Sequence, residues 1–203
     1  MKTNWKETMC VLIWFLAVSL VLWNVGCTSR FDPDAFVQRY VALHRSGDID
    51  GLLALHTKDA EFIIPGQNPI RGRKALRDLL EWDRVLQSEL DMDSIRMNGD
   101  TIVIDVVTET SKWFRAIGVS KARYGPGTRF VLRHGRIVGI YPASFDDETR
   151  DRVIRQFGRL AEWLTRNRPE VLDQLLPEGK FQYNAASARL WLTVLEEWNN
   201  ATR

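Results

Sequence analysis

FVQRYVALHRSGDIDGLLALHTKDAEFIIPGQ, residues 36–67, is the stretch that decides the fold. Its first part has apolar residues at helical spacing, which predicts an amphipathic helix. The apolar face of this helix consists of Phe36, Val37, Tyr40, Val41, Leu43 and His44. Asp32 or Asp34 can cap its start, and Gly47 can end it in the left-handed conformation.

A second helix and a strand complete this stretch. Asp48 can cap a helix whose apolar stripe covers residues 49–56. Lys58-Asp59 breaks that stripe, and the β-rich residues 61–64 predict a short strand. Pro65-Gly66 then ends the strand.

This stretch resembles the opening of the nuclear-transport-factor-2-like (NTF2-like, or SnoaL-like) superfamily, an α+β cone. It is especially similar to the start of ketosteroid isomerases, whose first helix also reads VQRYVA before a GD-x-DG turn. The matching positions are residues 37–42, Gly47, Asp48, Asp50 and Gly51. The resemblance implies a curved antiparallel sheet against which the N-terminal helices pack.

The following segments agree with this α+β class, because helices followed by a meander of strands are typical of it. The further predicted elements are a helix at 73–86, strands at 101–110, 129–132 and 136–141, and a helical turn or lid at 111–119. We expect the NTF2-like domain to span residues 27–145.

Beyond Pro142 the pattern becomes helical. Amphipathic spacing predicts helices at 146–166, 171–176 and 184–198. We expect residues 146–203 to form a helical C-terminal extension that packs on the sheet or on a partner. Exposure of both Trp191 and Trp198 would favour a partner, since large exposed apolar patches mark docking surfaces.

The N-terminus has the pattern of an export signal. Lysines precede an apolar run at residues 9–26, and Gly26-Cys27 resembles a bacterial lipobox in which Cys27 receives the lipid. Asn24 stands where such motifs usually carry Leu, so residues 1–26 are interpreted as a cleaved signal peptide or as an uncleaved anchor. Both interpretations predict a membrane-tethered domain in the bacterial cell envelope, facing the periplasm or the exterior.

Composition narrows the classes of function. Lys+Arg number 28 and Asp+Glu 26, and this balance does not indicate a nucleic-acid-binding protein. No cysteine follows Cys27, which excludes an internal disulfide and a thiol nucleophile in the body of the chain. No spacing of His and acidic residues suggests a metal site, and we expect no cofactor.

The resemblance to ketosteroid isomerases can be taken residue by residue. Tyr40 occupies the place of the tyrosine that serves as oxyanion donor. Ile64 stands at the position of the general base, before Pro65, and Thr128 is the nearest match to the third, acidic donor. Because isoleucine cannot accept a proton, the resemblance implies the scaffold and argues against that isomerisation.

Tyr40, His44 and Asp105 are the candidate catalytic residues. Tyr40 and His44 are four residues apart on one helix face, where they form either a polar pair in the cone or ordinary core packing. A histidine could activate water with Asp59 or Asp83 as its partner. Simple alternation places Asp105 with Val103, Val107 and Glu109, on either the concave or the solvent face.

Aromatic residues predict the lining of a pocket: Phe62, Trp82, Trp113, Phe114 and Tyr124. Trp113-Phe114 stands between predicted strands, and exposing both rings would forfeit about 1.5–3 kcal/mol each. The pair therefore either closes the cone over an apolar ligand or plugs the core.

Three functions follow from these observations. The first is a tethered domain that binds a small hydrophobic ligand or a protein partner without catalysis. The second is a SnoaL-like isomerase, cyclase, dehydratase or hydrolase acting on a small hydrophobic substrate. The third is a structural role in the envelope, and a homodimer is also compatible with the sequence.

Overall fold

The N-terminal stretch folds into two helices in the computed structural model, which describes residues 31–202. Helix α2 spans Pro33–Ser46 and begins where the Asp32 side chain accepts a hydrogen bond from the Ala35 amide. It ends at Gly47, whose φ of 68° is left-handed. Helix α3 spans Ile49–Leu55 and is capped by Asp48. Both predicted helices are confirmed.

Gly51 explains why the turn motif contains a glycine inside α3. A Cβ atom at this position would lie 2.5 Å from an Asp48 carboxylate oxygen and 2.7 Å from a Leu43 methyl group. The Gly51 amide instead donates to Asp48 at 2.8 Å. The cap and the close packing of α2 on α3 therefore both require glycine here.

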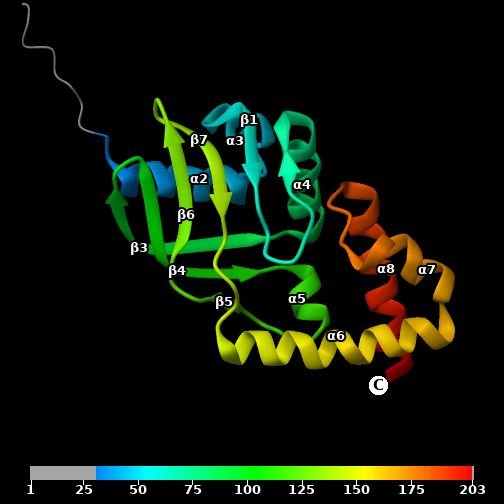
Figure 1. The fold of residues 1–203 in the computed structure, drawn as a ribbon. Helices are drawn as coiled ribbons and strands as arrows, with labels where there is room; N and C mark the ends of the chain where they lie inside the picture. The colour runs from blue at the N-terminus through cyan, green and yellow to red at the C-terminus, as the bar shows by residue number, and fades with distance from the viewer. Residues whose placement is uncertain (1–30, 203) are drawn as a thin grey trace, which may run out of the picture. The chain divides into compact units, whose positions relative to one another are not determined.

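The sheet has seven strands in the order β2-β1-β7-β6-β4-β3, with β5 paired to β4 (Figure 1). The strands are β1 His56–Phe62, β2 Ile70–Arg71, β3 Glu89–Asn98, β4 Thr101–Thr110, β5 Ala122–Tyr124, β6 Thr128–Arg133 and β7 Arg136–Tyr141. Neighbours are antiparallel except β1 and β7, which are parallel. This mixed α+β architecture confirms the expected fold class.

Helices cover one face of this sheet and bury its apolar residues. Figure 1 shows α2 crossing the sheet and α4, which spans Gly72–Leu86, standing beside β1. The core between them contains aliphatic residues of α2, α3, α4 and the strands, with Tyr40 and Phe130 as its buried aromatic members. The short helix α5, Lys112–Ala116, occupies the segment expected to be a helical turn or lid.

The first strand begins earlier than the sequence predicts. We expected it at residues 61–64, but β1 starts at His56, which has extended backbone and pairs with Ile137 of β7. Lys58-Asp59 breaks the apolar pattern because this part of the strand is exposed, with Asp59 paired to Arg133. The polar residues thus mark an exposed strand face and not a turn.

Strand β4 does not follow simple alternation, which corrects the expected placement of Asp105. Ile104 and Val107 both belong to the core, so the two residues between them point elsewhere. Val106 is 42% exposed, and Asp105 pairs with Arg96 of β3 at 3.1 Å. Opposite this point Ser94 of β3 has a φ of +57°, and the buried side of β4 shifts by one residue between Ile104 and Val107 while its pairing register with β3 stays the same.

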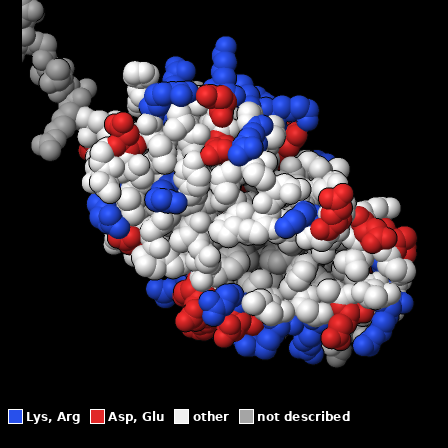
Figure 2. Space-filling view, viewed as in Figure 1, with Lys and Arg blue, Asp and Glu red and all other residues white. Residues whose placement is uncertain are grey.

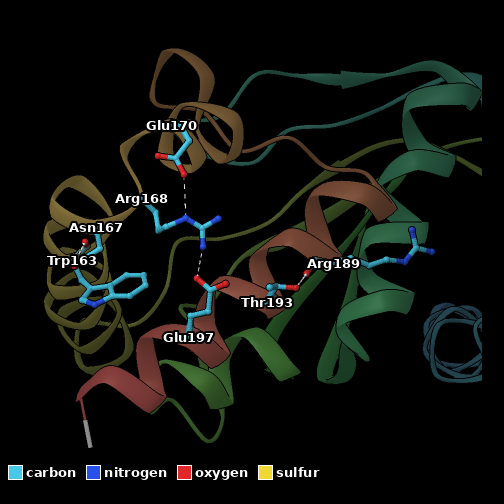
Figure 3. A network of polar contacts seen from close by, with 7 residues as sticks. All are labelled: Trp163, Asn167, Arg168, Glu170, Arg189, Thr193 and Glu197. Atoms are coloured by element: carbon cyan, nitrogen blue, oxygen red, sulfur yellow. Dashed lines mark hydrogen bonds and ion pairs between the residues drawn. The ribbon is translucent and has the colours of Figure 1, made fainter.

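The remaining chain forms α6 (Asp147–Asn167), α7 (Pro169–Leu175), the short 3₁₀ helix Pro177–Gly179 and α8 (Ala185–Thr202). Figure 3 shows Arg168 between α6 and α7, with its guanidinium bonded to Glu170 of α7 and Glu197 of α8. Trp191 and Trp198 are buried in a second, aromatic cluster with α4 and α5. The exposed tryptophan pair that would favour a docking surface is therefore not observed.

The predicted signal or anchor, including Cys27, lies outside the described residues. From Asp32 onward the chain forms one compact unit. In the part of the chain that the structure describes, no helix is both long enough and apolar enough to span a membrane.

Candidate functional site

A cavity of about 470 Å³ lies inside the compact unit, with mostly apolar walls. Its walls come from α2, α4, β4, the segment after β7 and residues 181–183, which precede α8. On the face shown in Figure 2, charged side chains lie mainly around the margin, and the uncharged centre is hollowed below the β1–β2 loop. A volume of this size is typical of small-molecule sites.

Seven of the eight residues predicted for catalysis or ligand binding line this cavity: Tyr40, His44, Phe62, Trp82, Trp113, Phe114 and Tyr124. Asp105 does not, because the shift in β4 directs it to its ion pair with Arg96 on the outer surface. Of the three predicted catalytic residues, Tyr40 and His44 therefore line the cavity and Asp105 does not. Glu109, also on β4, is the acid of that strand that lines it.

Aromatic rings form a continuous arc along the cavity wall. In order along the arc they are Tyr124, Phe145, Phe114, Trp113, Phe181, Tyr183 and Trp82. Successive ring centroids are between 4.8 and 6.1 Å apart, the range of favourable ring contacts. The arc fixes these rings against one another and gives the cavity a preformed apolar wall.

His44 and Asp83 form a dyad at the polar end of the cavity. The His44 Nε2 atom lies 3.3 Å from a carboxylate oxygen of Asp83, so α2 and α4 are joined at this point. Burial lowers the pKa of His44, but the hydrogen bond and charge of Asp83, helped by Glu109, outweigh it and raise that pKa above its ordinary value. The dyad therefore favours a protonated imidazole.

Glu109 is the second acid at this end. One oxygen of its carboxyl group accepts from the Ser88 hydroxyl at 2.7 Å and the other from the Tyr124 hydroxyl at 2.6 Å. Burial and the charge of Asp83 raise the pKa of Glu109, while these two bonds act in the opposite direction. At a given pH, such a carboxyl group is protonated to a greater extent than an exposed glutamate.

Two phenol groups complete the polar end. Tyr40 is buried and lines the cavity. Tyr183 also lines the cavity, and burial followed by the charges of Asp83 and Glu109 raises its pKa. Burial likewise raises the pKa of Tyr40, which keeps both phenols neutral and able to donate.

The positions matched to the ketosteroid isomerases all face this cavity. Tyr40, Ile64 and Thr128 are among its lining residues. Thr128 is buried and its hydroxyl accepts a hydrogen bond from the Ala143 amide at 3.0 Å. The three positions that the resemblance singled out therefore lie on one cavity, and Ile64 contributes an alkyl group to its wall.

Asp83, one of the two carboxylates expected to partner a histidine, is bonded to His44, whereas Asp59 is paired with Arg133. The sequence did not single out Ser88, Phe181 and Tyr183 as lining residues, and it placed Glu109 on the same face as Asp105 without choosing it. Phe181 and Tyr183 lie in an irregular segment where periodicity carries no information. His56 is also buried, its Nδ1–H donates to the Leu52 carbonyl oxygen at 2.9 Å, and burial lowers its pKa.

Comparisons with known proteins identify the family of the domain. The family described as the SnoaL-like domain matches residues 37–140, just over half of the chain. The chain belongs to the SnoaL-like domain family. Comparison with curated proteins gave no match. Among the described residues, no group of three acidic, histidine or cysteine side chains could hold a metal ion in this SnoaL-like domain.

Solved structures share the fold at low sequence identity. One is the epoxide hydrolase/cyclase-like enzyme SalBIII of pyran ring formation in salinomycin, with 14% identity, 58% of this chain and 92% of that chain covered, and a TM-score of 0.50. An LEH-like epoxide hydrolase from Mycobacterium tuberculosis has 18% identity, 63% and 92% coverage, and a TM-score of 0.48. RV0760c from the same organism, solved with estradiol-17beta-hemisuccinate, has 13% identity, 54% and 91% coverage, and a TM-score of 0.45.

Proposed function

We propose that this SnoaL-like domain binds a small, largely apolar molecule in the cavity. The observation that supports the proposal is a hollow of about 470 Å³ lined by an aromatic arc and closed by a polar end. Protein interiors are normally packed as densely as organic crystals, and unfilled apolar space is destabilising. A chain that keeps such a space and places hydrogen-bonding groups at one end is suited to a ligand with an apolar body and one polar group.

Binding of a neutral probe tests this proposal. The soluble part from Ser29 onward contains the compact unit, and 2-(1-naphthyl)ethanol has an apolar body and a single hydroxyl group. We expect saturable binding by isothermal titration calorimetry, with the affinity about tenfold weaker in Phe114→Ala because one wall of the arc is lost. Val106→Ala, on the outer surface of β4, is the matched control and leaves affinity unchanged. Absence of binding, or equal effects of both variants, contradicts the proposal.

A second candidate function is catalysis, and the polar end supports it. Tyr40, the His44–Asp83 dyad and Glu109 meet at one cavity, and shifted pKa values are typical of catalytic groups. In this alternative the chain is a SnoaL-like isomerase, cyclase, dehydratase or hydrolase of a small hydrophobic substrate. Glu109 would exchange a proton with the substrate, while Tyr40 donates to a developing oxyanion.

Turnover separates the two candidates. A ligand recovered from the purified protein is incubated with fresh protein and followed by liquid chromatography and mass spectrometry. Binding alone predicts an unchanged ligand. Catalysis predicts a product whose formation is lost in Glu109→Gln even when the variant is saturated with the ligand.

We further propose that the domain is tethered outside the cytoplasm of a bacterial cell by lipid on Cys27. The apolar run at residues 9–26 and the Gly26-Cys27 pair support this proposal. Mass spectrometry of the native protein tests it. A lipid-modified N-terminus at Cys27 is expected, whereas an intact N-terminal segment would favour the uncleaved anchor.

A further inference from the structure

We propose that the cavity selects ligands with one positively charged amine, whose nitrogen lies at Glu109 and whose apolar body lies against the aromatic arc. This inference rests on the proposed binding function and names the ligand class for the same site. Three features of the polar end and the walls support it.

The first feature is the state of Glu109. Both of its hydrogen bonds come from neutral hydroxyl groups, at 2.6 and 2.7 Å, so neither partner brings a positive charge to the carboxyl group. A carboxylate offers about four lone-pair sites, so acceptor capacity remains on the Glu109 oxygens beyond these two bonds. Among residues 31–202, no basic side chain forms an ion pair with Glu109.

The second feature is the balance of charge along the walls. The charged or titratable lining residues besides phenols are His44, Asp83, Glu109 and Arg150. His44 is bonded to Asp83, so its positive charge is already shared with that carboxylate. Arg150 is half-exposed on α6 and paired there with Asp147 and Asp151. Glu109 is therefore the acid that a cationic ligand would neutralise.

The third feature is the aromatic arc. Faces of tryptophan, tyrosine and phenylalanine rings attract cations, most strongly where water is excluded. Tyr124 connects the arc to the acid, because its hydroxyl donates to Glu109 while its ring lies 4.8 Å from Phe145.

Three probes of the same shape test the inference. These are 2-(1-naphthyl)ethylamine, 2-(1-naphthyl)ethanol and the anion of 1-naphthaleneacetic acid. Each is titrated at pH 7.5 into the part of the protein from Ser29 onward. We expect the amine to bind about tenfold more tightly than the alcohol, the factor of one charge-assisted hydrogen bond, and the anion to bind most weakly.

A substitution at Glu109 tests whether this residue causes the preference for the amine over the alcohol. Glu109→Gln keeps the size of the side chain and removes its charge, so it lowers the affinity for the amine about tenfold and leaves that for the alcohol within about threefold. Asp105→Asn is the matched control, because it removes a charge from the outer surface of the same strand. It leaves the affinities for both probes unchanged.

The pH dependence of the wild type gives a test without any substitution. As the pH falls, Glu109 takes up a proton and His44 becomes fully charged, while Asp83, Tyr124 and Tyr183 face the same space. Both changes disfavour a cation, so the ratio of amine to alcohol affinity declines from pH 8 to pH 5. A constant ratio, or an alcohol that binds as tightly as the amine at pH 7.5, overturns the inference and leaves the binding function standing. Failure of all three probes to bind overturns both.

Discussion

The cavity lies between two regions that are packed from different kinds of side chain. Under the sheet, the core is built within residues 37–140 and consists mainly of Leu, Ile and Val. On the other side, the cluster of α4 and α5 with α6–α8 contains Trp82, Trp113, Trp191 and Trp198. Tyr183 packs against both clusters.

This difference separates what the family fold supplies from what the last helices add. The residues matched by the SnoaL-like domain family provide the sheet, Tyr40, the dyad and Glu109. Residues beyond the match provide Phe145, Phe181 and Tyr183, which complete the arc. We infer that the polar end belongs to the common scaffold, while the aromatic wall depends on the C-terminal helices.

The largest expected effect comes from removing the centre of the aromatic cluster. Trp191 is 0% exposed and contacts Trp113, Phe157 and Phe181, so Trp191→Ala should lower the free energy of unfolding by about 3–5 kcal/mol. Phe130→Ala, in the core under the sheet, is the matched variant with a similar expected loss. Urea unfolding followed by circular dichroism and by tryptophan fluorescence measures both.

These two variants also test whether the regions are independent. Because α8 packs on α4 and both clusters enclose one cavity, we expect one transition that both probes report together. Separate transitions for the two probes, with Trp191→Ala moving only one of them, would show that the regions unfold on their own.

A smaller effect is expected when the wall is trimmed at its C-terminal part. Phe181→Ala removes a ring that contacts Trp113 and Tyr183, and loss of its burial on the ligand should weaken binding of 2-(1-naphthyl)ethanol roughly tenfold. Ile154→Ala, at a position that is 62% exposed, is the control for a change in the C-terminal helices. Equal affinities in wild type and Phe181→Ala would mean that the ligand contacts residues 37–140 and not the C-terminal part of the wall.

Removing the charge of Glu109 at the polar end should stabilise the protein, in contrast to the core substitutions, which destabilise it. Glu109 has a raised pKa in the folded protein, so between its unfolded value of 4.5 and its folded value the native state binds more protons. Stability is therefore lost as the pH rises through this window, and Glu109→Gln should be more stable than wild type by on the order of 1 kcal/mol at pH 7.5. Thermal unfolding at pH 7.5 and pH 4 measures it, and the gain should shrink at the lower pH. A gain that is equal at both pH values would contradict the assignment to this carboxyl group.

The smallest expected effect is at the surface of the C-terminal helices. Arg168 is bonded to Glu170 and Glu197, but the three side chains are well exposed to solvent, where ion pairs contribute little (Figure 3). Arg168→Ala should lower the melting temperature by about 2 °C or less, and added salt should reduce the difference. A much larger shift would mean that polar contacts, more than the buried tryptophans, hold these helices together.

The sequence predicted local structure where a helix-capping side chain, a glycine or the regular spacing of apolar residues determines it. Asp32, Gly47 and Asp48 delimit α2 and α3 through short-range bonds that the sequence shows directly. The resemblance to ketosteroid isomerases placed Tyr40, Ile64 and Thr128 at positions that line one cavity.

The sequence failed where distant strands determine the geometry. The exposed start of β1 depends on its pairing with β7, and the side chain order in β4 depends on the distortion opposite Ser94. Simple alternation puts Asp105 and Glu109 on one face, but the one-residue shift between Ile104 and Val107 sends Asp105 to the outer surface and leaves Glu109 on the cavity. Phe181 and Tyr183 lie in an irregular segment that is bonded to the β1–β2 loop, where the Phe181 amide donates to the Gln67 side chain at 2.9 Å.

A structure of the soluble part from Ser29 onward, saturated with 2-(1-naphthyl)ethanol, tests the central claim most directly. The account predicts the naphthyl group between the aromatic arc and Tyr40, with the hydroxyl group within hydrogen-bond distance of Glu109 or Tyr40. It would be contradicted by a cavity filled with the rings of Phe181 and Tyr183 while the probe occupies another site or none.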